Sequence, residues 1–187
     1  SIVIDSKKEK SVINDPFKGV IYRGPIVVLV NSNTASASEF FASIMQDYNR
    51  ALLLGSSTLG KATMQTILPL DEKKNTDFLK ITINKFYRIT GKSHQYIGVK
   101  PDVALPEFYE DIYQKESDFP TAMKNDSIEP FLKYKTYVKR NLIDKIAKNS
   151  SERLSDNYFF NNIKKINLKI DQLVNTPKSE TPLTLDA

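Results

Sequence analysis

Two polar residues in this chain have the types and surroundings needed for hydrolysis by a nucleophile. Ser36 begins a predicted helix directly after an apolar strand, and Lys61 stands twenty-five residues later in a glycine-bounded loop. A serine hydroxyl becomes an effective nucleophile when a neighbouring base removes its proton. The chain has no cysteine and one histidine, His94, so a Cys-His pair is excluded and a Ser-His-Asp triad would depend on His94 alone. We therefore expect lysine to be the base.

Ser36 also fits a purely structural role. The pattern Ser-x-x-Glu, formed by Ser36 and Glu39 before an apolar periodic run, is a capping-box signature. The same position suits acyl transfer, because backbone N–H groups at a helix start are unpaired and the helix dipole favours a developing oxyanion. Ala35 and Ala37 on either side leave room for a substrate backbone. Both interpretations stay open on this pattern alone.

Lys61 has two rival interpretations. It is a surface lysine in a glycine turn, or it ends a phosphate-binding P-loop, because residues 55–61 follow an apolar strand. Two features oppose the P-loop. Ala62 stands where the Mg²⁺-binding Ser or Thr belongs, and the residues that follow are strand-like, so no helix N-terminus would meet the phosphates.

A lysine can act as a base only when it is neutral, and an unperturbed lysine has a pKa of about 10.4. Burial away from carboxylates lowers that pKa. Leu59 and Met64 give Lys61 apolar neighbours, and no acidic residue occurs between Asp47 and Asp71. The local sequence therefore favours a buried lysine. His94 lies in a polar turn, which predicts a solvated side chain with no role.

The hydrophobic pattern predicts an α/β core followed by helices. The continuous apolar run at 26–30 indicates a strand covered on both faces, and the strand-helix-strand order implies a right-handed parallel crossover. Residues 78–87 alternate, which predicts a strand with one buried face that carries Leu79, Ile81 and Ile83. The expected elements are strands at 1–4, 20–22, 26–30, 51–54, 63–70 and 78–87, a helix at 35–48, a hairpin tip at 71–75, and two or three helices from 131 onward.

Length and charge distribution limit the classes of protein to which the chain could belong. The 187 residues contain no apolar run long enough to span a membrane, and the start carries neither a methionine nor a signal peptide, so we expect a fragment of a longer protein. The net charge of +5 arises at residues 131–170, which hold ten Lys or Arg against three Asp or Glu. A basic helical surface of this kind is typically solvated, so we expect no nucleic-acid partner.

Four stretches, taken together and in order, resemble the catalytic core of the C-terminal processing (tail-specific) serine proteases. They are residues 31–39 (NSNTASASE), 46–51 (QDYNRA), 55–65 (GSSTLGKATMQ) and 98–102 (GVKPD). Residues 85–88 (KFYR), followed by the turn at Gly91, fit the longer, tail-specific branch of that family. The resemblance covers about residues 20–106.

The resemblance implies a crotonase-like α/β core and a Ser-Lys dyad. Ser36 would be the nucleophile, Lys61 the general base and Gln65 the residue that positions Lys61, while the Ala37 amide would donate to the oxyanion. No metal or organic cofactor is implied. Residues 1–106 would form the catalytic core and residues 107–187 a helical C-terminal extension.

The implied function is a serine endopeptidase of the bacterial cell envelope or periplasm that hydrolyses proteins with apolar C-terminal tails. The family's PDZ domain and the glycine-rich stretch that supplies a second oxyanion donor do not occur in this chain. We therefore expect the isolated chain to be an incomplete enzyme. Membrane association and oligomeric state of the parent protein stay open. The alternative is a non-catalytic binding or scaffold module that keeps the protease fold, with Ser36 as a helix cap.

Overall fold

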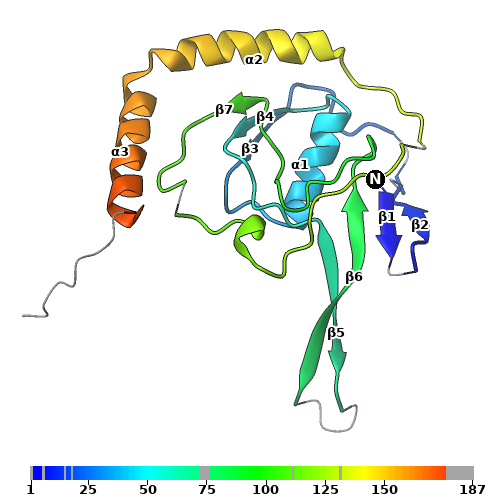
Figure 1. The fold of residues 1–187 in the computed structure, drawn as a ribbon. Coiled ribbons are helices and arrows are strands. Elements are labelled where there is room, and N and C mark those ends of the chain that lie inside the picture. The colour runs from blue at the N-terminus through cyan, green and yellow to red at the C-terminus, as the bar shows by residue number, and fades with distance from the viewer. Residues whose placement is uncertain are drawn as a thin grey trace, which may run out of the picture.

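The computed structural model describes residues 2–5, 7–14, 16–17, 19–71, 76–110, 112–130 and 132–175. Two small sheets, one central helix and two C-terminal helices make up the described chain (Figure 1). In chain order the elements are β1 (Ile2–Asp5), β2 (Lys10–Val12), β3 (Val27–Val30), α1 (Ala37–Asp47), β4 (Leu52–Gly55), β5 (Thr63–Pro69), β6 (Phe78–Tyr87), β7 (Val103–Ala104), the 3₁₀ helix η1 (Glu116–Asp118), α2 (Arg140–Ser155) and α3 (Tyr158–Asn175).

The sheet β3-β4-β7 is parallel, and α1 connects its first two strands. Val30 and Leu53 from the sheet, Ala42 from α1 and Val99 from the segment before β7 form a buried apolar cluster. The predicted strand-helix-strand unit is therefore confirmed, with each element within two residues of its expected bounds. The short strand β7 was not predicted, because two residues carry no periodicity.

The prediction that the first strand of this unit is covered on both faces is wrong for the described chain. Val27 and Leu29 of β3 are 56% and 75% exposed. β3 is the edge strand of its sheet, and α1 packs on the other face. The predicted strand at 20–22 is not formed either, because Arg50 donates to the carbonyls of Tyr22 and Gly24 in place of a strand partner.

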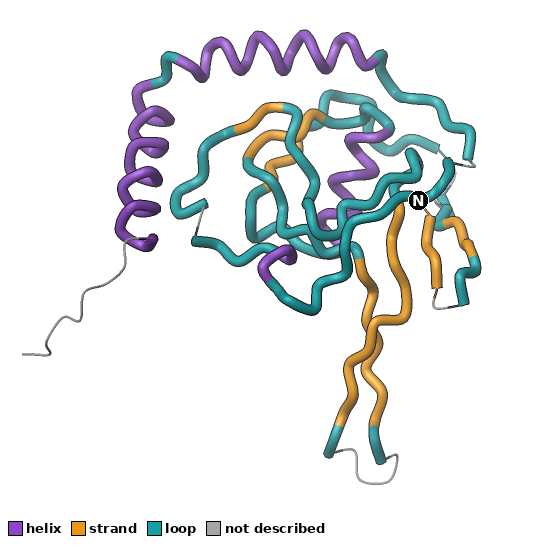
Figure 2. The backbone as a smooth tube through the Cα atoms, in the orientation of Figure 1, coloured by secondary structure: helices purple, strands orange, loops and turns teal. Residues whose placement is uncertain are grey.

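The second sheet is antiparallel, in the order β2-β1-β6-β5, and its β5–β6 hairpin projects from the body (Figures 1 and 2). We predicted one buried face along β6, but burial instead follows the distance from the body. Phe78 at the far end is 54% exposed, whereas Phe86 at the base is buried and stacks on Phe40 of α1 with ring centroids 4.8 Å apart. Most of the predicted hairpin tip, residues 72–75, lies outside the described residues.

The C-terminal part wraps around the core. Residues 112–130 and 132–139 are irregular apart from η1, and α2 and α3 then cross the top and one side of the molecule (Figure 1). Asn167 attaches α3 to the core: its amide donates to the carbonyl of Glu107 at 2.6 Å and accepts from the N–H of Tyr109 at 3.1 Å. The division of the chain at residue 106 stays a prediction.

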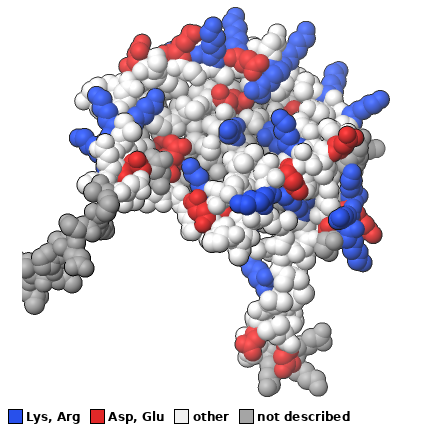
Figure 3. All heavy atoms as spheres, viewed as in Figure 1, with Lys and Arg blue, Asp and Glu red and all other residues white. Residues whose placement is uncertain are grey.

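The basic charge of this part is spread among acids. Lys and Arg side chains along α2 lie next to acidic ones in Figure 3, and Arg140–Asp144 and Lys148–Glu152 are ion pairs one helical turn apart. Each described helix is too short or too polar to cross a membrane.

Candidate active site around Ser36 and Lys61

Ser36 occupies the N-cap of α1 with an unusual backbone conformation. Its φ is 54° and its ψ is −114°. The backbone of a residue other than glycine is strained at positive φ, and such strain persists only where the surrounding structure enforces it. The fold therefore holds Ser36 in this conformation at a cost in free energy. Ala37 is the first residue of α1, so its N–H belongs to the first turn, whose N–H groups have no acceptor within the helix.

The side chain of Glu39 joins the serine to the lysine loop. One carboxylate oxygen, Oε2, accepts from the N–H of Ser36 at 2.9 Å and from the N–H of Lys61 at 2.8 Å. The other oxygen, Oε1, accepts from the N–H of Gly60 at 2.7 Å and from the hydroxyl of Thr58. The two backbone segments, distant in sequence, are therefore fixed against a single carboxyl group.

Glu39 is completely buried, and its four hydrogen-bond donors are one hydroxyl and three backbone N–H groups. Burial raises the pKa of Glu39, and the hydrogen bonds from Thr58, Gly60, Lys61 and Ser36 oppose that rise. In sequence, Glu39 matches only one half of a capping box. That half is present, but the same carboxylate also makes long-range contacts that the local pattern does not reveal.

The side chains of Lys61 and Gln65 are in contact. Nζ of Lys61 donates to Oε1 of Gln65 at 3.1 Å. Lys61 precedes β5 and Gln65 lies on it, next to an irregularity in the pairing with β6 between Met64 and Gln65. Both residues line a cleft of about 430 Å³. The role of Gln65 as the residue that positions Lys61 stays a prediction.

The surroundings of Lys61 differ from those expected. Lys61 is partly exposed rather than buried, and the sequence neighbour Met64 is 37% exposed. The apolar lining of the cleft comes in part from Phe119 and Met123, far along the chain, and Glu116 lines the same cleft. Glu116 is distant from Lys61 in sequence, so the absence of acids between Asp47 and Asp71 does not reveal this carboxylate in the cleft.

The turn after β6 differs from expectation at His94. His94, predicted to be solvated, is 2% exposed, and Gln95 is completely buried. Burial lowers the pKa of His94 to about 4, with a smaller effect in the same direction from the charge of Arg88 and an opposing one from the Lys61 backbone. The turn is polar in composition but lies against the Lys61 loop, where the N–H of Tyr96 donates to the carbonyl of Gly60 at 2.7 Å.

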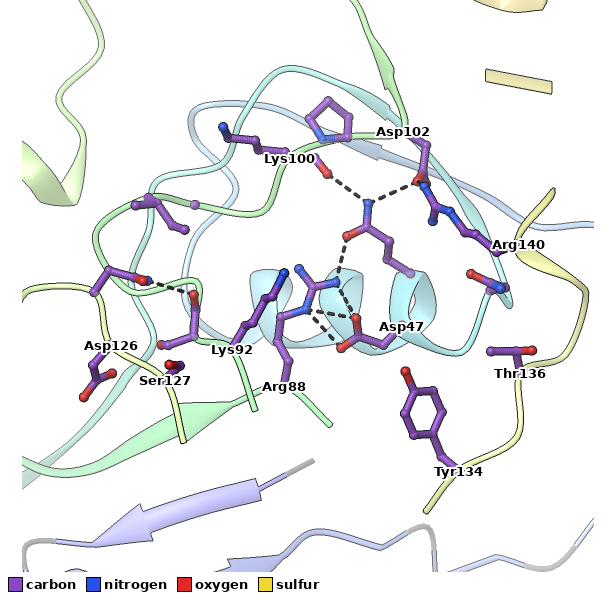
Figure 4. Close-up of a pocket in the computed structure, with 17 residues that line it drawn as sticks. Asp47, Arg88, Lys92, Lys100, Asp102, Asp126, Ser127, Tyr134, Thr136 and Arg140 are labelled. Carbon is purple, nitrogen blue, oxygen red and sulfur yellow. Dashed lines mark hydrogen bonds and ion pairs between the residues drawn. The ribbon is translucent and has the colours of Figure 1, made fainter. Parts of the chain in front are cut away.

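The opposite end of α1 carries a charged cavity of about 780 Å³ (Figure 4). Arg88 extends toward Asp47, and its Nε lies 3.0 Å from both carboxylate oxygens. Asp102 is buried and accepts from the N–H of Leu53 at 2.9 Å and from Arg140 at 3.0 Å. The first contact joins α1 to the residue after β6, and the contacts of Asp102 join β4 to the start of α2.

The structure opposes the P-loop interpretation of Lys61. The loop at residues 55–61 leads into strand β5. A P-loop leads into a helix whose N-terminus binds the phosphates.

Comparison with known proteins places this geometry in a protein family. A family model described as peptidase family S41 matches residues 3–105. A tail-specific protease of Haemophilus influenzae is 37% identical over 128 residues, which are 66% of this chain and 18% of that protein. A carboxy-terminal-processing protease of Bartonella bacilliformis is 43% identical over 89 residues, 46% of this chain and 20% of that protein.

Among solved structures, the photosystem II D1 C-terminal processing protease is similar to this chain. It is 40% identical, with a TM-score of 0.39, over 43% of this chain and 20% of that one. The chain therefore spans about a fifth of the length of these relatives.

Proposed function

Because the chain belongs to peptidase family S41 and has the α/β protease fold, we propose that it carries the catalytic dyad of a serine endopeptidase, with Ser36 as nucleophile and Lys61 as general base. The observation that supports this most is the shared contact of Glu39. One buried carboxylate oxygen accepts from the N–H groups of both residues. A helix cap alone needs no attachment to the lysine loop, whereas a dyad needs the two residues in a constant relative position.

The chemistry is acyl transfer. The Ser36 hydroxyl attacks the carbonyl carbon of the scissile bond while Lys61 takes its proton, and the tetrahedral oxyanion forms near the N-terminus of α1, where the Ala37 N–H donates to it. The C–N bond then breaks as the Lys61 ammonium returns the proton to the leaving amine. A water molecule, deprotonated by Lys61, attacks the acyl-enzyme and releases the new C-terminus. Gln65 holds the Lys61 side chain during both steps, as its hydrogen bond to Nζ suggests.

The finer parts of the proposal rest on the resemblance. They are a crotonase-like core, protein substrates recognised by apolar C-terminal tails, a bacterial envelope or periplasmic location, and a second oxyanion donor outside this chain. The names of the relatives, which refer to tails or carboxyl termini, support the substrate class.

The test uses the full-length protein that contains this chain, with an unfolded substrate that ends in an apolar tail. Ser36→Ala and Lys61→Arg should each lower kcat by about 10³-fold or more, because alanine has no hydroxyl to attack the substrate and arginine stays protonated and cannot accept a proton. The matched controls are Ser38→Ala, an exposed serine directly before Glu39, and Lys80→Arg, an exposed lysine on β6. Both controls should cleave like the wild type.

Unchanged cleavage in the Ser36 or Lys61 variant would place the chemistry elsewhere. No cleavage by the wild type on several unfolded substrates would favour the scaffold module over the protease.

A further inference from the structure

The cleft beside Lys61 has a second wall that comes from the C-terminal part of the chain. Its lining combines Lys61 and Gln65 with residues of the segment 116–123. The N–H of Glu116 donates to the carbonyl of Leu59 at 3.0 Å, which brings η1 beside the start of the hairpin (Figure 2). This segment lies beyond the residues that the family model matches. We call residues 116–123 the cleft wall.

A completely buried side chain holds the cleft wall against the lysine loop. Oε1 of Gln95 accepts from the N–H of Ala62, next to Lys61, at 2.7 Å. Its Nε2 donates to Oε1 of Glu116 at 3.0 Å and to the carbonyl of Met123 at 3.2 Å. Gln95 therefore links the backbone beside Lys61 to both ends of the wall, and its amide helps to set the position of the wall beside the lysine loop.

The cleft wall offers apolar surface to whatever enters the cleft. Phe119 and Met123 remain 43% and 47% exposed, and Ala122 lies between them in the lining. Partly exposed aromatic and methionine side chains that line a cleft, next to a few polar groups, are typical of sites that bind an apolar group. The polar groups in the same lining include Lys61, Gln65 and Glu116.

Resting on the proposed protease function, we propose that Phe119 and Met123 contact the apolar side chain of the substrate residue next to the scissile bond, and that Gln95 is the positioning residue that sets the wall. The cleft lies beside the base, so a peptide whose scissile bond reaches Lys61 passes along the wall. The site thus selects apolar residues at the point of cleavage, separately from any recognition of the C-terminal tail.

Binding to a full-length Ser36→Ala protein tests this without depending on turnover. The probes are two synthetic peptides with the same apolar tail, one with interior Leu-Ser repeats and one with Gly-Ser repeats. We expect the Leu peptide to bind about 10-fold more tightly, because one apolar contact commonly changes affinity by 10-fold or more. Phe119→Ala or Met123→Ala should remove most of this preference and change the binding of the Gly peptide less than about 2-fold.

Phe78→Ala is the matched control, because Phe78 is 54% exposed at the far end of the hairpin. It should keep the full preference for the Leu peptide. Equal weakening of both peptides by the Phe119 and Met123 variants, or no change in either, would overturn the inference. Both variants truncate partly exposed side chains, so they are expected to fold and to decide the question.

Exchange of the amide and the carboxylate between Gln95 and Glu116 tests the positioning role of Gln95. Gln95→Glu removes the donor to Glu116 and Met123 and sets two carboxylates together, so the preference for the Leu peptide should fall about 10-fold. Adding Glu116→Gln restores a donor between the two side chains and should recover part of the preference. A double variant no better than the single one would contradict this role. The proposed dyad fails separately, if the Ser36→Ala protein still cleaves its substrates.

Discussion

The two ends of α1 are held by acids of the same helix, but through different kinds of contact. At the N-terminal end, completely buried Glu39 accepts hydrogen bonds from one hydroxyl and three backbone N–H groups. At the C-terminal end, Asp47 pairs with Arg88, and Arg140 pairs with Asp102. One end uses neutral donors and the other uses cations.

This difference matches what each end has to hold. Backbone N–H groups have little freedom to move, so Glu39 fixes the main chain at Ser36 and Lys61, which the proposed acyl transfer would require. Long charged side chains reach further and tolerate small shifts, so Arg88 and Arg140 join elements that are distant in sequence. We infer that the contacts at the N-terminal end fix the positions of Ser36 and Lys61, whereas those at the C-terminal end hold elements of the fold together.

Removal of the Glu39 carboxylate should have the largest effect. Glu39→Ala leaves four buried or part-buried donors without an acceptor, and each buried orphan costs about 1–3 kcal/mol, so we expect a loss of about 4 kcal/mol or more in the free energy of unfolding. Urea denaturation measures it. Glu152→Ala, an exposed glutamate of α2, is the control and should change stability by less than about 0.5 kcal/mol. A loss below about 1 kcal/mol would show that Glu39 does not organise this end.

The pKa of buried His94 is affected by groups near both ends of α1, namely the charge of Arg88 and the Lys61 backbone. Protonation of His94 should therefore make the free energy of unfolding depend on pH. Its folded pKa of about 4 lies below the usual 6.5, so its contribution is present above pH 6.5 and is lost as the pH falls toward 4. The free energy of unfolding should fall by up to about 3 kcal/mol over this window.

His94→Gln should reduce the pH dependence of stability between pH 6.5 and 4, measured by urea denaturation at several pH values in both proteins. Parallel pH curves for the wild type and the variant would show that His94 is not buried in the neutral form.

Removal of the cation at the other end should have a moderate effect. Arg88→Met leaves the nearly buried Asp47 without its partner and should cost about 2 kcal/mol. Adding Asp47→Asn removes the stranded charge and should recover about 1 kcal/mol. A double-mutant cycle by urea denaturation gives this coupling. If the losses in free energy of unfolding from the two substitutions simply added, the pair of Arg88 and Asp47 would not stabilise the fold.

Arg140→Ala should have the smallest effect, about 0.5 kcal/mol, because Arg140 is 51% exposed and Asp102 keeps the hydrogen bond from the Leu53 N–H. Thermal denaturation in low and high salt should show the difference shrinking as salt rises. Lys148→Ala, which breaks an exposed pair of 4.0 Å, is the control and should be neutral. A loss above about 2 kcal/mol would mean that Arg140 is as important to assembly as Arg88.

Much of the core could be predicted from local patterns. The apolar runs, the helical periodicity and the glycine-bounded loop correctly indicated β3, α1, β4 and β5, with Ser36 at the helix start and Lys61 before a strand. These features depend on residues within about ten positions of one another, where period and turn chemistry decide. The ordered motifs then identified the family, which residues 3–105 match.

Other features required the tertiary structure. The contacts of Glu39 with Gly60, of Gln95 with Ala62 and of Gln95 with Met123 join residues 21 to 33 positions apart. No local pattern encodes such distances. His94 is polar in type yet buried, and Phe78 is apolar yet exposed, because burial is set by what packs against a residue rather than by its own character.

The sequence by itself therefore determined the order of the elements and the residues with reactive groups, since both follow from short-range periodicity and residue type. Only the tertiary structure decided that one carboxylate joins Ser36 to Lys61, and that a wall from the C-terminal part faces the lysine. The physical reason is that hydrogen-bond partners and burial arise only when distant segments meet.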